Sequence, residues 1–135
     1  MTRREQNLEK LKKEQEFITS IKEQKIDGKT KNKFRLTSVW KTFREFMKNK
    51  YKIDYLTHRK LKQGWNLHHA DFSSNHYTEL DETKFFCLNK ESHSNLHWFI
   101  SEQIKDPTFM QRITEEVNLH IQLNNGKDVK DFLKD

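Results

Sequence analysis

Cysteine, proline and glycine are scarce in this chain of 135 residues, which has one cysteine, one proline and three glycines. A single cysteine excludes an internal disulfide. Cys87 lies in the apolar run FFCL, where we expect a buried, unreactive thiol. The fold must therefore be held together by packing.

Long apolar runs are also missing. No segment approaches the roughly 18 apolar residues of a membrane span, and the N-terminus, MTRREQNLEK, lacks the apolar stretch of a signal peptide. We therefore expect a soluble, unsecreted, cytoplasmic protein with no membrane partner. Its composition, 33% apolar and 34% charged residues, suits one domain with a modest core plus an extension.

The charge is distributed unevenly along the chain. Residues 1–63 hold 19 Lys and Arg against 8 Asp and Glu, a net charge of +11, whereas residues 64–135 hold 7 against 12, a net charge of −5. A basic half of this kind is typical of polyanion binding, although basic segments also serve as solubilising surface. We expect DNA to be the partner of the basic half.

The first 33 residues read as a basic helical arm and a linker. Residues 3–24 place Leu8, Leu11, Ile18 and Ile21 at helical spacing among charged residues, which predicts a helix with a thin apolar stripe. Such a helix can be a solvated element docked by its stripe, a dimerising or partner-binding arm, or a DNA-tracking arm. The segment IDGKTKNK at 26–33 is expected to be a linker, so we place a domain at 34–135.

A second helix is predicted after Thr37 or Ser38, either of which can cap it. Its apolar positions include Trp40 and Phe43, and aromatic residues at this spacing usually form core. The cations of this region are candidate phosphate ligands, namely Lys41, Arg44, Lys48, Arg59, Lys60 and Lys62.

The stretch from 65 to 99 contains five of the seven histidines and organises the rest of the chain. Gly64 suits a turn into a strand that carries His68 and His69, and FFCL at 85–88 reads as the second strand of a hairpin. Adjacent strand residues point to opposite sides, so the two histidines are expected to have different roles. Asp71 and His76, in the polar segment after this strand, are further candidate site groups, whereas His58 is expected to be an exposed turn residue.

A helix is predicted to follow the second strand, capped by Asn89 or Ser92. It carries His93 and His97, which are four residues apart and therefore share one helical face. Two imidazoles on one face, with a third from the strand, can hold a divalent cation and leave a coordination position open. Imidazole ligands favour zinc, nickel or cobalt by affinity, while availability favours magnesium or manganese.

The C-terminal part is expected to be helical from about 107 to 134. Asp106-Pro107 is a strong helix-start signal, and Asn124-Asn125-Gly126 is expected to end that helix. The fold class is therefore α+β, mainly helical.

At the histidine motifs, LHHAD followed by LNKESHSNLHW, the sequence resembles the HNH, or ββα-metal, endonucleases. It is especially similar to small phage-type HNH proteins and to the nuclease domains of DNase colicins, over about residues 61–99. The resemblance implies a ββα-metal core in which His68, His93 and His97 bind the metal and His69 is the general base. It further implies hydrolysis of DNA phosphodiester bonds to a 5′-phosphate and a 3′-hydroxyl.

Two features depart from that family. The family's middle asparagine falls here on Lys84, which adds positive charge near the metal and is a candidate ligand for the scissile phosphate. Many relatives also bind structural zinc through paired CxxC motifs, which a chain with one cysteine cannot build. The alternative to an HNH endonuclease is a non-catalytic DNA- or protein-binding module that keeps the ββα-metal fold.

Overall fold

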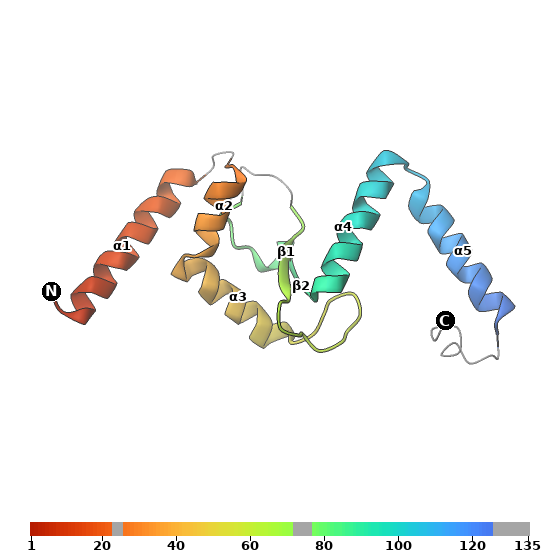
Figure 1. The fold of residues 1–135 in the computed structure, drawn as a ribbon, viewed down its shortest axis with the longest axis horizontal. Helices are drawn as coiled ribbons and strands as arrows, with labels where there is room; N and C mark the ends of the chain where they lie inside the picture. The colour runs from red at the N-terminus through yellow and green to blue at the C-terminus, as the bar shows by residue number, and fades with distance from the viewer. Residues whose placement is uncertain (23–25, 72–76, 126–135) are drawn as a thin grey trace. The chain divides into compact units, whose positions relative to one another are not determined.

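The computed structural model describes residues 1–22, 26–71 and 77–125. It is mainly helical with one small antiparallel sheet (Figure 1), as the α+β prediction requires. The elements are α1 Arg3–Ile21, α2 Gly28–Arg35, α3 Ser38–Tyr51, β1 Asn66–His69, the 3-10 helix η2 Glu82–Lys84, β2 Phe85–Leu88, α4 Lys90–Lys105 and α5 Phe109–Leu123.

The chain divides into two compact units, Met1–His93 and Ser94–Asp135. The division falls inside α4, which runs through it as one continuous helix. None of the helices in the described ranges is long and apolar enough to cross a membrane.

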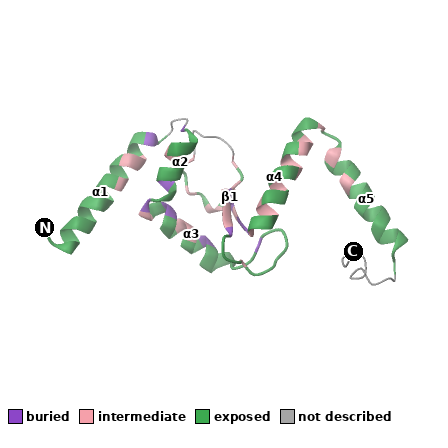
Figure 2. Cartoon of the chain, viewed as in Figure 1, coloured by how far each residue is buried: buried purple, intermediate pink, exposed green. Residues whose placement is uncertain are grey.

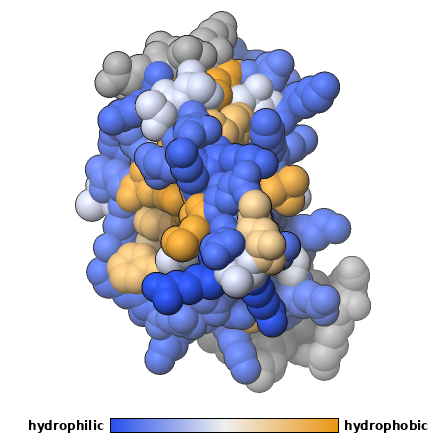
Figure 3. Space-filling view, turned by 90° about the vertical axis from the view of Figure 1, so that its left-hand side faces the viewer, coloured by the Kyte–Doolittle hydropathy of each residue, from blue (hydrophilic) through white to orange (hydrophobic). Residues whose placement is uncertain are grey.

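Helix α1 begins with a capping box formed by Thr2 and Glu5, which satisfies two of the free N–H groups at its start. The predicted helix at 3–24 is confirmed, ending at Ile21. Leu8 and Leu11 are exposed, whereas Ile21 is buried. The side of the molecule on which α1 lies is mostly hydrophilic, with separate hydrophobic areas (Figure 3).

Most of the predicted linker at 26–33 is a helix, so that prediction was wrong. Asp27 caps α2, its side chain accepting the N–H of Thr30 at 2.8 Å. Near the end of α2, Phe34 is fully buried. The aromatic ring that holds α2 in place lies just past the polar run, beyond the boundary that composition indicated.

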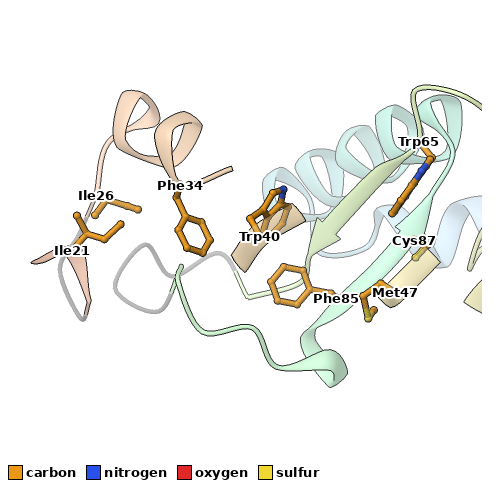
Figure 4. Close-up of a cluster of buried hydrophobic side chains, with 8 residues drawn as sticks. All are labelled: Ile21, Ile26, Phe34, Trp40, Met47, Trp65, Phe85 and Cys87. Carbon is orange, nitrogen blue, oxygen red and sulfur yellow. The ribbon is translucent and has the colours of Figure 1, made fainter. Parts of the chain in front are cut away.

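The buried cluster of the first unit joins α2, α3 and the hairpin (Figure 4). Thr37 caps α3 as predicted, accepting the N–H of Trp40 at 3.3 Å. Phe85 of β2 packs edge-on against Phe43, with ring centroids 5.0 Å apart. The cluster consists of Ile21, Ile26, Phe34, Trp40, Met47, Trp65, Phe85 and Cys87. The expected burial of Cys87 is confirmed, and this burial raises the pKa of its thiol.

The hairpin has the register that presents the histidines on opposite faces. Strand β1 pairs with β2 so that His68 lies opposite Phe86 and His69 opposite Phe85. Gly64 forms the turn before β1 with φ of +85°, a conformation that glycine adopts readily. The β2 strand spans the predicted FFCL run.

The second unit contains the rest of α4 and α5, and neither helix has a buried residue in the described ranges (Figure 2). Phe109 contacts both Trp98 and Phe99, at ring-centroid distances of 5.6 and 6.1 Å. Helix α5 begins two residues later than the Asp-Pro signal predicted, at Phe109. Asp106 instead accepts the N–H and hydroxyl of Thr108 in the preceding turn.

Helix α5 ends at Leu123, where the asparagine pair forms a turn, as expected. The rest of the predicted C-terminal helical segment, 126–134, lies outside the described residues, as does His76.

Candidate metal centre

The structure brings the three predicted metal ligands together. One ring nitrogen from each of His68, His93 and His97 can be chosen so that all three lie within 4.8 Å of one another. His68 comes from β1 and is buried, while His93 is half-buried and His97 exposed. The rings of His68 and His93 stand edge to face, with centroids 5.3 Å apart.

These residues fit a divalent cation. Ligand nitrogens at about 2.0–2.1 Å from a tetrahedral zinc ion lie roughly 3.3 Å from each other, which is compatible with ring nitrogens that lie within 4.8 Å of one another. His93 and His97 are one helical turn apart on α4, so the helix itself sets their spacing. The exposure of His97 leaves one side of the centre open to solvent, which is where water or a phosphate could bind.

The N-terminus of α4 is tied to the loop after α3 by Asp54, a residue that the sequence analysis did not identify. Asp54 is fully buried, and its Oδ2 accepts the backbone N–H of Asn89 at 2.7 Å. Its Oδ1 accepts the N–H groups of Leu56 and Thr57, both at 2.8 Å. Burial raises the pKa of Asp54, but hydrogen bonds from Thr57, Asn89, Ser92 and Leu56 outweigh that effect and lower it. The carboxylate is therefore held ionised.

Asn89 occupies the expected cap position, yet its side chain bonds to the backbone of the loop that precedes β1. Its Oδ1 accepts the N–H of Lys62 at 2.8 Å, and its Nδ2 donates to the carbonyl of Lys60 at 3.1 Å. Asp54 and Asn89 thus hold the segment from 54 to 62 and the start of α4 as one structure. Aspartate favours turns because its side chain bonds to nearby backbone groups, but nothing in the local sequence indicates a partner 35 residues away.

His69 lies on the opposite side of β1 from His68, as the strand geometry predicts. Its ring stacks on Phe85, with centroids 4.3 Å apart and planes 8° from parallel, and it also lies 6.1 Å from the ring of Tyr77. Its Nε2 is buried with no hydrogen-bond partner among the residues that the structure describes.

The imidazole of His69 is held in its neutral form. Burial lowers its pKa from the ordinary value of 6.5; the carboxylate of Asp71 opposes this shift, and the cations of Lys84 and Lys31 add to it. A neutral imidazole near pH 7 can accept a proton, which is the property a general base needs.

Lys84 is the last residue of η2, directly before β2, and lies close to the chain that follows His69. Its carbonyl accepts the N–H of Ala70 at 2.8 Å. Its Nζ is 3.9 Å from Asp71 Oδ2, and its side chain is 40% exposed. The contact is long for an ion pair, so the ammonium of Lys84 can still reach an anion in solvent.

The predicted phosphate ligands separate into two groups. Lys41, Lys48, Arg59, Lys60 and Lys62 are exposed. Arg44 is half-buried, lies 3.9 Å from the ring centroid of Trp65 and donates to the Trp65 carbonyl at 2.9 Å. Arg44 therefore has a packing role in this structure. His58 is exposed in a turn, as expected.

Comparisons with known proteins add no assignment: no family model, curated protein or solved structure matches this chain. The likeness to HNH endonucleases rests on the motif residues alone.

Proposed function

We propose that this protein is a metal-dependent endonuclease of the HNH type that hydrolyses DNA phosphodiester bonds. The observation that carries the proposal is the proximity of His68, His93 and His97, whose ligand nitrogens can be chosen to lie within 4.8 Å of one another. This grouping joins a hairpin and a helix in the order that the motif resemblance implies. The net charge of +11 over residues 1–63 supports a polyanionic substrate.

His69 has the role of general base in this proposal. Its neutral imidazole takes a proton from a water molecule, the water oxygen bonds to phosphorus, and the bond from phosphorus to the 3′ oxygen breaks. The 3′ oxygen then takes a proton from solvent, which leaves a 5′-phosphate and a 3′-hydroxyl. His68, His93 and His97 would hold a divalent cation, which would supply charge stabilisation for the phosphate and the leaving oxygen.

A second candidate is a binding module with a structural metal. The observation that favours it is the stacking of His69 on Phe85 together with the burial of its Nε2, because a core-packed imidazole needs no catalytic role. This candidate keeps the three metal ligands and binds DNA or a protein without cleaving it.

Plasmid nicking by the purified full chain, with Mg²⁺, Mn²⁺, Ni²⁺ and Zn²⁺ in turn, tests the proposal. We expect nicking with at least one of these ions. His93→Ala should lose both nicking and metal binding, the latter measured by calorimetry. His69→Ala should lose nicking and keep one bound metal. His120→Ala, an exposed histidine on α5, is the matched control and should keep both.

Each other outcome has a definite meaning. Nicking that survives in His69→Ala would remove His69 from the mechanism. One bound metal per chain, with no nicking under any ion, would establish the binding module in place of the enzyme.

A further inference from the structure

Helix α2 carries two cations on one face. Lys31 and Arg35 are four residues apart, so they are neighbours on the helix surface. Both lie over the ring of Tyr77, with Lys31 Nζ 5.1 Å and Arg35 Cζ 5.7 Å from its centroid. Tyr77 itself packs edge-on against Phe34, at 5.8 Å between centroids, which fixes the ring beneath the two cations.

This pair of cations lies close to His69. The ring of Tyr77 is 6.1 Å from the ring of His69, and Lys31 Nζ and Arg35 Cζ lie 5.1 and 5.7 Å from the centroid of the same Tyr77 ring. Tyr77 therefore contacts both the pair of cations and His69.

The two cations lack an acidic counterpart within the described part of the chain. Neither Lys31 nor Arg35 forms a salt bridge there. Arg35 Nη1 donates to the neutral amide oxygen of Asn32 at 3.1 Å, and its guanidinium also interacts with the neutral hydroxyl of Tyr77. Like charges four residues apart on a helix repel one another. An anion placed between them would relieve this repulsion and receive charge-assisted hydrogen bonds.

We propose that Lys31, Arg35 and Tyr77 form a binding subsite for a backbone phosphate of the DNA strand whose scissile bond lies at His69. The inference rests on the proposed function, because it names the part of the protein that positions that substrate. Arginine can bind a phosphate through two parallel N–H groups, lysine adds a point charge, and phosphate contacts of this kind set the register of a nucleic acid on a protein.

The test uses the double variant Lys31→Gln/Arg35→Gln in full-length protein that also carries His69→Ala, so that DNA is not cut. Glutamine has nearly the helix propensity of lysine and arginine. The control is Lys29→Gln/Lys33→Gln, which removes the same charge from the opposite side of α2, since two residues turn a helix by about 200°. Circular dichroism checks that both variants fold.

Binding of a labelled short duplex is measured across a range of salt concentrations. We expect the Lys31/Arg35 variant to lose about tenfold or more in affinity and its log K against log salt slope to become shallower by about 1–2. The control should lose less than threefold. Lys31→Arg, which keeps the charge, should bind as the parent does.

The second measurement is the kinetics of DNA cleavage, made with variants that keep His69. Loss of a contact made equally in ground and transition states raises KM and leaves kcat unchanged, so the Lys31/Arg35 variant should show a raised KM. Equal losses in the two double variants, or no DNA binding by the parent, would overturn the subsite. Absence of cleavage under every metal would overturn the proposed function alone, because DNA affinity still reports on Lys31 and Arg35.

Discussion

The buried carboxylate of Asp54 accepts the backbone N–H of Asn89 at 2.7 Å, which joins the loop after α3 to the residue just before α4, the helix that carries two of the candidate metal ligands. Asp54 thereby satisfies a donor at the start of α4, where N–H groups lack partners within the helix. A negative charge at a helix N-terminus also interacts favourably with the helix dipole. The position of His93, one turn into α4, depends on this contact.

Asp54→Asn should therefore destabilise the protein by about 1–3 kcal/mol, because an amide nitrogen would face one of the backbone donors that the carboxylate now accepts. Urea unfolding followed by circular dichroism measures this change. Metal affinity, measured by calorimetry, should fall as well, since the start of α4 is less firmly placed.

The control for Asp54 is Asp27→Asn. Asp27 also accepts a backbone N–H, from Thr30 at 2.8 Å, but at an exposed helix cap, where asparagine is as good as aspartate. In Asp27→Asn the free energy of unfolding of the protein should change by less than about 0.5 kcal/mol. Equal effects in the two variants would mean that burial of Asp54 has no special consequence.

Phe34→Ala tests whether α2 belongs to the core. Phe34 is fully buried and its ring contacts Trp40 and Tyr77 at 5.9 and 5.8 Å, so its loss should cost about 3–5 kcal/mol. Leu36→Ala is the control, because Leu36 is 68% exposed. Chemical denaturation measures the free energy of unfolding of both variants. A small effect of Phe34→Ala would restore the interpretation of this segment as a linker.

Much of the hairpin and its histidines follows from local pattern. The FFCL run predicts β2 because four consecutive apolar residues suit a strand with both faces covered, and three of the four are buried. Opposite roles for His68 and His69 follow from strand geometry. The approach of His68 to His93 and His97 was expected from the motif resemblance, and the structure confirms that these side chains lie close together.

Other features depend on contacts that a sequence pattern does not contain. The run IDGKTKNK has a helix breaker and almost no apolar residue, yet α2 forms there because Asp27 caps it and Phe34 anchors it. The burial of Asp54 depends on its partner Asn89, far along the chain. The stacking of His69 on Phe85 depends on the cross-strand register, and periodicity alone does not specify that register.

Titration of Asp106 should show a low midpoint. Hydrogen bonds from Arg112 and Thr108 lower the pKa of its carboxyl to about 2 from the ordinary value of 3.8. Because the folded-state pKa is lowered, this group contributes stability above about pH 4, and the contribution is lost as pH falls toward 2. NMR titration of the carboxyl measures the midpoint. Arg112→Gln should move it upward, and an unchanged midpoint would show that the arginine is not its partner.

Arg44→Gln should reduce stability more than DNA affinity. The guanidinium lies 3.9 Å from the Trp65 ring centroid and donates to the Trp65 carbonyl, and loss of both contacts should cost about 1–3 kcal/mol. Lys41→Gln, at an exposed position of the same helix, removes the same charge and should leave stability unchanged. Thermal unfolding and DNA titration are measured on both. Equal stability with a larger loss of DNA affinity in Arg44→Gln would make Arg44 a phosphate ligand.

Lys84→Asn addresses the departure from the HNH pattern. We expect cleavage to fall through a several-fold increase in KM with little change in kcat, because the variant loses a cation that is 40% exposed and only loosely paired with Asp71, at 3.9 Å. Removing a phosphate contact made before and during the reaction raises KM in this way. Lys84→Arg keeps the charge and should keep the parental KM.

The opposite result is equally informative for Lys84. An increase in kcat on introducing asparagine would mean that a neutral donor and acceptor beside His69 serves the reaction better than a cation does. Initial rates over a range of DNA concentrations, at saturating metal, distinguish the two outcomes because kcat and KM are measured separately. Since the Lys84 side chain is 40% exposed and its contact with Asp71 is long, substrate binding is the role that we propose for Lys84.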